Sequence, residues 1–296
     1  MRSLLFILLL LFCHCGQPSL KRYTFFALGS PCSVKFTGGR EDLFDSIRLE
    51  CIRIEKKYSL IETLNQHGKL IDPELAKLVR LGVELSRLTK GRYDITCHPL
   101  VDLWGFYNHN FHLPNQTELE KTLERVDYRR ITISGDTIQL DNVEIDLGSM
   151  IQGYAADRII ALLKRNHIAQ ALVDIGGEIS GYGRKWRVGI KDPRKNRILK
   201  ILDVDGSIAT SGDYENFFIL DGIRYHHIID CITGYPVQGI IATSVRAKTC
   251  ILADILATAL FILGPEEGKR VAIRYGVEAL WVDQDLNIIT TEGFYD

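Results

Sequence analysis

The sequence predicts an α+β fold in which mixed sheets are flanked by helices, and two kinds of pattern support it. Several segments repeat apolar residues at the helical spacing of three and four, and others read as strands joined by a Gly-containing turn. After its first residues the chain shows no internal repeat, low-complexity tract or linker. We therefore expect one compact domain over residues 23–296, preceded by a separate segment at residues 1–15.

Composition describes an ordinary soluble globular protein. The 296 residues are 46% hydrophobic and 25% charged, and the formal net charge is -1. The charge is close to zero and no basic stripe stands out, which argues against nucleic acid as the main partner.

The N-terminal segment has the pattern of a signal peptide. Arg2 precedes an apolar run, residues 4–12, that is too short to span a bilayer. Cys13 and Cys15 follow directly, and a cysteine in this place suggests a bacterial lipoprotein held at a membrane surface. We expect export, and the sequence leaves open which cysteine carries the lipid. The other five cysteines are scattered without a C-x-x-C pair, so we expect core residues and neither a zinc site nor a disulfide framework.

In the first part of the domain, strands precede two helices. Residues 23–36 read as a strand interrupted at 28–31. Helical periodicity predicts helices over 41–58 and 73–88, with a loop at 59–68 between them.

Three shorter features come next. Residues 91–106 predict a turn and a short extended piece with Trp104 at its end, either as an aromatic wall or as a core residue. A capping box from Thr117 to Glu120 predicts a short helix, and residues 130–140 predict a hairpin.

Glycine turns mark the middle of the chain. Residues 145–165 read as a short strand, a glycine turn and a helix, an arrangement whose free N–H groups can bind an anion. Residues 169–183 predict a buried strand that ends in a glycine pair. Small and oxygen-bearing residues then form a turn at 208–214.

A hairpin is predicted over residues 217–229, with Asp221-Gly222 at its tip. Its second strand carries His226 and His227. Adjacent strand residues face opposite sides, so only one of them can face a given site. Residues 243–248 and 279–291 predict further strands.

The central prediction is a helix over residues 250–264, apolar on every face and followed at Pro265 by another helix. It carries Asp254 and, four residues later, Thr258, which places their oxygens one turn apart on the same face. A buried carboxylate needs a positive partner, and no Lys or Arg lies in the helix. The partner is either a divalent cation or a distant Arg; in the second case Thr258 bonds back to its own helix.

Six motifs, in this order, make the chain from residue 23 onward resemble the ApbE-type FAD:protein FMN transferases. They are GRYDITCHPLVDLWGF, IDLGSMIQGYAAD, ALVDIGGEISGYG, IATSGDYEN, YHHIIDCITGYPV and ADILATALFILG. The resemblance implies a Mg²⁺-dependent enzyme, exported and often lipidated, at the periplasmic face of the bacterial inner membrane. It would move FMN from FAD to a threonine or serine hydroxyl of an acceptor protein, typically a membrane redox-complex subunit, and release AMP.

The resemblance also implies site residues. Asp254, Thr258 and the backbone carbonyl of Ile151 match the metal ligands, and His227 matches the group that activates the acceptor hydroxyl. Asp230 is a candidate to orient that histidine. Positions that match the FAD pocket are Leu28, Trp104, Gly105, Phe106, Asp146, Gly176, Gly177, Glu178, Thr210, Ser211 and Gly212.

Two departures from the family pattern stand out. Gln152 occupies the position of a family lysine, which removes a positive charge near the phosphates. Residues 58–65 are shorter than the family loop, so its aromatic residue has no clear counterpart. Two alternatives stay open: a Mg²⁺-dependent FAD pyrophosphatase giving FMN and AMP, and a lipid-anchored flavin-binding protein without turnover.

Overall fold

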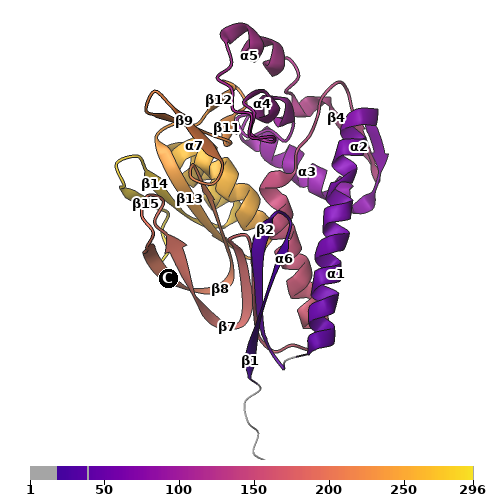
Figure 1. The fold of residues 1–296 in the computed structure, drawn as a ribbon, viewed down its shortest axis with the longest axis vertical. Helices are drawn as coiled ribbons and strands as arrows, with labels where there is room; N and C mark the ends of the chain where they lie inside the picture. The colour runs from indigo at the N-terminus through magenta and orange to yellow at the C-terminus, as the bar shows by residue number, and fades with distance from the viewer. Residues whose placement is uncertain (1–18, 39, 296) are drawn as a thin grey trace, which may run out of the picture.

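The computed structural model describes residues 19–38 and 40–295. The domain is built around an eight-stranded sheet in which every neighbouring pair is antiparallel (Figure 1). In spatial order its strands are β1 (Leu20–Ala27), β2 (Ser30–Thr37), β6 (Ala171–Ile175), β7 (Glu178–Lys191), β8 (Ile198–Gly212), β13 (Ile240–Ala247), β14 (Glu278–Asp283) and β15 (Ile288–Thr290).

Three small sheets complete the β structure. They are β3 (Lys69–Ile71) with β5 (Thr137–Leu140) and β4 (Ile131–Ser134), the hairpin β9 (Phe217–Leu220) and β10 (Ile223–His226), and the pair β11 (Ile229–Asp230) and β12 (Tyr235–Pro236). The helices are α1 (Glu41–Tyr58), α2 (Leu60–His67), α3 (Pro73–Leu88), α4 (His98–Leu103), α5 (Gln116–Leu123), α6 (Gly148–Arg165) and α7 (Cys250–Tyr275), with a 3-10 turn at Tyr128–Arg130. The predicted α+β class is confirmed.

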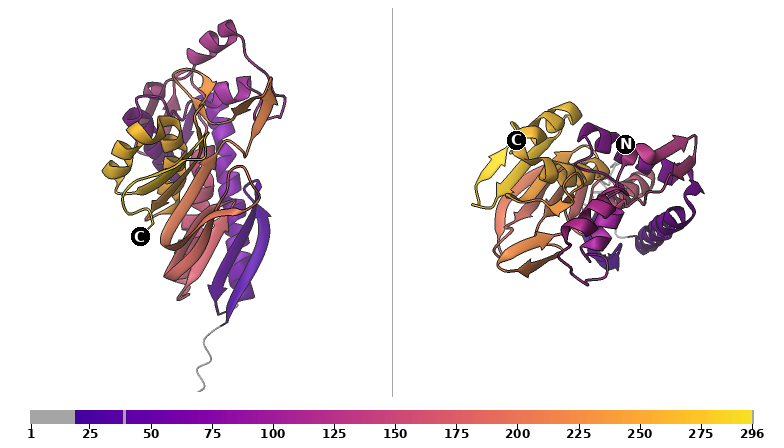
Figure 2. Two further views of the ribbon diagram at one scale, coloured as in Figure 1. Left: turned by 90° about the vertical axis from the view of Figure 1, so that its left-hand side faces the viewer. Right: turned by 90° about the horizontal axis from the view of Figure 1, so that it is seen from above.

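Helices α6 and α7 pack on one another and on the large sheet, and together they form the centre of the main core (Figures 1 and 2). The first part of α7 is buried around its whole circumference, as its apolar sequence predicts. At Gly264 the backbone turns left-handed, with φ 70°, and Pro265 begins a second helical segment. The predicted end of the first helix is therefore correct.

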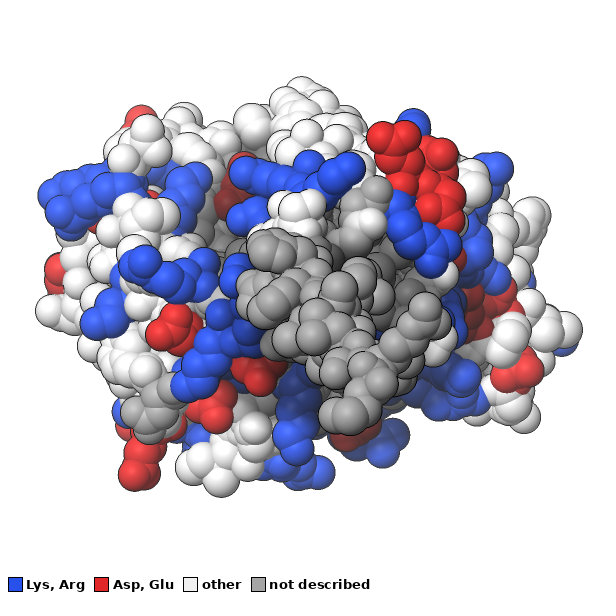
Figure 3. Space-filling model, turned by 90° about the horizontal axis from the view of Figure 1, so that it is seen from below, with Lys and Arg blue, Asp and Glu red and all other residues white. Residues whose placement is uncertain are grey.

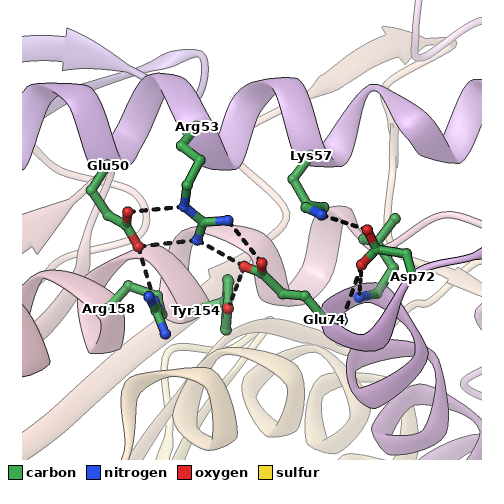
Figure 4. Close-up of polar contacts among 8 residues, drawn as sticks. Glu50, Arg53, Lys57, Asp72, Glu74, Tyr154 and Arg158 are labelled. Atoms are coloured by element: carbon green, nitrogen blue, oxygen red, sulfur yellow. Dashed lines mark hydrogen bonds and ion pairs between the residues drawn. The ribbon is translucent and has the colours of Figure 1, made fainter. Parts of the chain in front are cut away.

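An ion-pair network joins α1, α3 and α6 (Figure 4). The Arg53 guanidinium lies 2.7 Å from a Glu74 carboxylate oxygen and 2.9 Å from Glu50, while Arg158 of α6 also reaches Glu50 at 2.9 Å. The Tyr154 hydroxyl donates to Glu74 at 2.5 Å. The network thus holds α6 against both α1 and α3.

Three local predictions are wrong. The predicted loop at 59–68 contains helix α2, which buries Ile61 and Leu64 and ends at the left-handed Gly68. Residues 91–106 contain helix α4. The capping box of α5 is formed by Asn115 and Glu118, two residues before the predicted pair.

A fourth prediction, the strand at residue 145, also fails. The Asn65 side chain pairs with both backbone groups of Ile145, at 2.8 and 2.9 Å, so a side chain takes the place of a neighbouring strand.

The prediction that the five cysteines are core residues is confirmed for four of them. Cys32, Cys51, Cys97, Cys231 and Cys250 are free, and all but Cys97 are buried. The predicted signal segment with Cys13 and Cys15 lies outside the described residues. Among the described helices, none is both long and apolar enough to cross a membrane.

Candidate active site

A cavity of about 420 Å³ lies where the turn between β6 and β7, the end of β8 and the helices α6 and α7 meet. The β1–β2 turn and the residues around the β9–β10 hairpin complete its wall. Ten predicted site residues line it: Phe106, Asp146, Gly176, Glu178, Thr210, Ser211, Gly212, His227, Asp254 and Thr258. Segments distant in the sequence therefore meet in one place.

Five predicted residues are not part of this lining: Leu28, Trp104, Gly105, Ile151 and Gly177. Trp104 is fully buried, and its indole N–H donates to the Gly234 carbonyl at 2.9 Å. It is therefore a core residue, in the same hydrophobic cluster as Phe106. Gly105 is left-handed, and a Cβ there would lie 1.9 Å from the Asn110 carbonyl oxygen. It shapes the loop.

Asp254 is 7% exposed and meets no cationic side chain among the described residues. Its carboxylate accepts the Gly153 backbone N–H at 2.8 Å, and burial raises its pKa to about 8. The alternative of a distant Arg partner is therefore wrong.

Thr258 lies one turn further along α7, and for this residue too the alternative of a purely structural role is wrong. Its hydroxyl lies 3.0 Å from the Ser211 hydroxyl at the end of β8, rather than bonding back to its own helix. Asp254 and Thr258 both face the cavity, as their spacing predicts.

The cavity wall is acidic. It contains five carboxylate side chains and no Lys or Arg; the carboxylates belong to Asp94, Asp146, Glu178, Glu215 and Asp254. Glu178 is buried and its Oε2 has no hydrogen-bond partner, and burial together with the nearby Asp254 raises its pKa well above the ordinary value. Such a site favours a bound cation, because the cation compensates buried negative charge.

The described residues hold no cluster of three or more His, Cys, Asp or Glu side chains suited to a metal. A cation in this cavity would therefore need hydroxyl, carbonyl, phosphate or water oxygens beside Asp254. These are the ligands that Mg²⁺ prefers. The donor set fits that ion.

His227 is half-buried at the cavity wall and is held by one backbone carbonyl. Its Nδ1 lies 3.2 Å from the Asn216 carbonyl oxygen, which also accepts the His227 backbone N–H at 3.1 Å. A carbonyl only accepts hydrogen bonds, so Nδ1 carries the proton and Nε2 keeps a free lone pair. Burial lowers the pKa of His227, which keeps the ring neutral near pH 7.

The expectation that Asp230 orients this histidine is wrong. Asp230 accepts a hydrogen bond from the Arg92 guanidinium at 2.8 Å. His226, on the opposite side of the strand, bonds to the Val237 carbonyl at 2.7 Å and does not line the cavity. The orienting group is a main-chain atom of Asn216, which no side-chain pattern in the sequence could reveal.

Asp146 is held by three donors. The Tyr58 and Tyr107 hydroxyls donate to its two oxygens at 2.7 and 2.6 Å, and the Gly148 backbone N–H, at the start of α6, donates at 2.6 Å. Tyr58 and Tyr107 were not predicted as site residues. Of the two, Tyr107 lines the cavity, whereas Tyr58 contacts the lining residue Asp146.

Gln152, which replaces the family lysine, has a structural role as well as a place in the cavity wall. Its amide donates to the Leu28 carbonyl at 3.2 Å and to the Ser30 hydroxyl at 2.8 Å. It thus fastens the β1–β2 turn to α6. Leu28 itself is left-handed at that turn, and its N–H donates to Glu55.

Comparison with known proteins identifies the family. The family model described as the ApbE family matches residues 28–281. The chain belongs to the ApbE family. The order and spacing of its six motifs thus reflect common descent.

Relatives and solved structures match this ApbE-family chain over most of its length. The Vibrio cholerae FAD:protein FMN transferase is 34% identical over 256 residues, 81% of this chain and 75% of that protein. The Escherichia coli FAD:protein FMN transferase is 31% identical over 251 residues, 78% and 72% of the two chains. The crystal structure of the ApbE protein of Thermotoga maritima superposes with a TM-score of 0.86 at 29% identity, covering 93% of this chain and 98% of that one.

Proposed function

We propose that this protein transfers FMN from FAD to the hydroxyl of a threonine or serine on an acceptor protein and releases AMP, in a Mg²⁺-dependent reaction. One observation carries the proposal: the buried Asp254, its neighbour Thr258 and the neutral His227 line the same acidic cavity. The relatives named FAD:protein FMN transferase support the chemistry.

Asp254, Thr258 and the backbone carbonyl of Ile151 would hold the Mg²⁺ ion. Ile151 lies in the first turn of α6, next to Gln152 of the cavity wall. When bound, the ion supplies positive charge to the diphosphate of FAD, which the cavity's own side chains do not provide.

His227 would act as the general base. Its Nε2 takes the proton of the acceptor hydroxyl, and the resulting oxygen attacks the phosphorus atom of the FMN half of FAD. A new P–O bond to the acceptor forms as the P–O bond to the AMP half breaks, and AMP leaves with the bridging oxygen. The Asn216 carbonyl keeps the imidazole in the required tautomer.

The flavin would lie along the residues that line the cavity. Phe106 offers an aromatic surface, and the turn at Gly176–Glu178 and the end of β8 at Thr210–Gly212 bring backbone groups close to the ligand. Contacts of FAD with Leu28, Trp104, Gly105 and Gly177 stay predictions.

We also propose an exported, lipid-anchored protein at the periplasmic face of the inner membrane, with a membrane redox-complex subunit as acceptor. In this arrangement the end of the domain where β1 begins faces the membrane, and the side chains at this end support the proposal. The register places Lys21, Phe36, Ala171 and Tyr182 in one row, and Lys164 lies over the Tyr182 ring. Basic side chains gather on this face (Figure 3), which suits an anionic lipid surface.

The test is incubation with FAD, Mg²⁺ and an acceptor protein of the Vibrio cholerae transferase, beside an acceptor-free control. We expect covalent FMN on the acceptor, seen as an added FMN mass and as protein-bound flavin fluorescence, with one AMP per FMN. FMN and AMP formed equally without acceptor would identify a pyrophosphatase instead. Retained FAD without any AMP would identify a flavin-binding protein without turnover.

A further inference from the structure

The β9–β10 hairpin rises directly from the edge of the cavity. Asn216 precedes β9, His227 follows β10, and both residues line the cavity. The hairpin pairs with no other strand in the described chain, and it projects beside the large sheet (Figure 2). Both ends of the hairpin are therefore anchored in the cavity wall, and one of these ends carries His227.

A continuous row of aromatic rings leads from the cavity onto this hairpin. Phe106, in the cavity wall, lies 5.8 Å from Phe111 and 6.1 Å from Phe218, measured between ring centroids. Phe111 stacks on Phe218 at 5.1 Å, and Phe218 stacks on Tyr225 at 5.2 Å. The aromatic surface that Phe106 gives to one part of the wall thus continues outward.

The outer end of this row is exposed to solvent. Leu220 and Ile223 are paired across the hairpin and, by the alternation of strand residues, share the face of Phe218 and Tyr225. They are 40% and 49% exposed, and Phe111 is 38% exposed. We call Phe111, Leu220 and Ile223 the hairpin surface. Contiguous exposed apolar groups of this kind mark sites of interaction with a partner.

We propose that the hairpin surface docks the acceptor polypeptide, binding apolar residues beside its reactive threonine or serine while the hydroxyl reaches His227. This inference rests on the proposed function. A protein nucleophile can insert only its reactive residue into a cavity of about 420 Å³, so the rest of the acceptor lies on the rim. Leu220 and Ile223 of the hairpin surface belong to the hairpin whose second strand leads directly to His227.

A double variant, Leu220→Ser with Ile223→Ser, tests the proposal, with an acceptor protein of the Vibrio cholerae transferase as probe. Loss of two apolar contacts at an interface raises the KM for the acceptor roughly tenfold or more, which corresponds to 1.4 kcal/mol or above. We expect unchanged kcat at saturating acceptor and unchanged FAD affinity, because neither residue lines the cavity. The matched control is Ile71→Ser, an isoleucine 70% exposed on β3, which leaves the KM unchanged.

The outcomes separate the two proposals. If the wild type flavinylates the acceptor and the double variant keeps its KM, the docking surface is overturned and the transferase function stands. If the wild type splits FAD into FMN and AMP but flavinylates no acceptor, the proposed function fails and the docking surface fails with it. A raised KM for the acceptor together with unchanged FAD affinity supports docking. A misfolded variant would instead lose FAD binding as well as acceptor binding.

Discussion

At the scale of single residues, His227 depends on the Asn216 carbonyl for its orientation and on burial for its protonation state. We expect His227→Asn to lower the rate of FMN transfer about 10²- to 10⁴-fold, the usual contribution of a general base. FAD affinity should stay the same, as isothermal titration can show. A variant that also loses FAD binding would contradict a purely catalytic role.

The pH profile gives a second check on the same residue. Burial lowers the pKa of His227 below its ordinary value of 6.5, so the neutral base is present throughout the range above that value. With Mg²⁺ at saturating concentration, so that Asp254 does not titrate, the kcat/KM of the wild type should therefore be flat from about pH 7 upward and fall only in more acidic solution. An acid limb centred above pH 6.5 would contradict the assignment.

Asp254 links the metal site to stability. Its pKa is raised from 3.8 to about 8, so the folded, metal-free protein holds a proton that the unfolded chain releases. Stability from this group is therefore lost as the pH rises from about 4 to 8. We expect metal-free Asp254→Asn to melt at a higher temperature than the wild type at pH 8, with a smaller difference at pH 5. Each kcal/mol of destabilisation that the substitution removes should raise the melting temperature by about 2–4 °C.

The same calorimetry, repeated with Mg²⁺, separates charge burial from metal binding. The ion should raise the melting temperature of the wild type and leave that of Asp254→Asn unchanged, because ligand binding stabilises only a protein that has the site. Equal stabilisation of both proteins would remove Asp254 from the metal site.

Gln152 stands where the resemblance to the family implies a lysine. We expect Gln152→Lys to tighten FAD binding roughly tenfold at low ionic strength, since a charge-assisted hydrogen bond to phosphate contributes about 1.5–3 kcal/mol. The control is Gln152→Met, which also removes the bonds to Leu28 and Ser30 but adds no charge. Equal affinities of the two variants would show that the amide, and not the missing charge, is what matters.

At the scale of elements, the contact between α6 and α7 positions the carboxylate of the site. A Cβ on Gly153 would lie 2.5 Å from the Cys250 carbonyl oxygen and 2.7 Å from the Cβ of Asp254. We expect Gly153→Ala to destabilise the protein by about 1–3 kcal/mol, because the helices must separate, and to weaken the stabilisation by Mg²⁺. Chemical denaturation with and without the ion measures both effects.

A glycine elsewhere provides the control for that variant. In Gly82→Ala the new Cβ would meet the Ile95 side chain at 2.6 Å, a packing defect in α3. This variant should lose stability while the increment from Mg²⁺ stays as in the wild type. Equal loss of the Mg²⁺ increment in both variants would mean that packing in general, and not the α6–α7 contact, controls the site.

The elements that the sequence predicted well are those in which periodicity repeats over several turns or a turn signal is strong. Helices α1, α3, α6 and both parts of α7 belong to the first kind, and the β9–β10 hairpin belongs to the second. Helices α2 and α4 are too short for their periodicity to stand out, and both owe their place to tertiary contacts such as the Asn65–Ile145 pairing.

Site prediction had a similar limit. Spacing placed Asp254 and Thr258 on one face, and the family motifs placed His227, all of which line the cavity. Contacts through the backbone or between distant segments could not be foreseen: Asn216 orients the histidine, and Tyr107 holds Asp146. Local sequence carries the identity of functional groups, whereas the fold decides which group contacts which.

At the scale of the whole molecule, the cavity collects residues from the β1–β2 turn to α7, so the site needs nearly the complete domain. The main core likewise runs from β1 and β2 to β14. The described elements lie between residues 20 and 290, and the anchor predicted at residues 1–15 precedes them in the sequence.

This separation predicts the behaviour of a chain that starts at residue 19. We expect its melting temperature and its rate of FMN transfer to equal those of the full chain, because the described core and cavity are retained. We expect its association with membranes to fall sharply, since the basic face alone provides only about 1 kcal/mol for each Lys or Arg near an anionic surface and is screened by salt. Sedimentation with phosphatidylglycerol vesicles at physiological ionic strength measures the difference. A truncated chain that still sediments as the full chain does would show that the domain surface, and not a lipid on Cys13 or Cys15, holds the protein at the membrane.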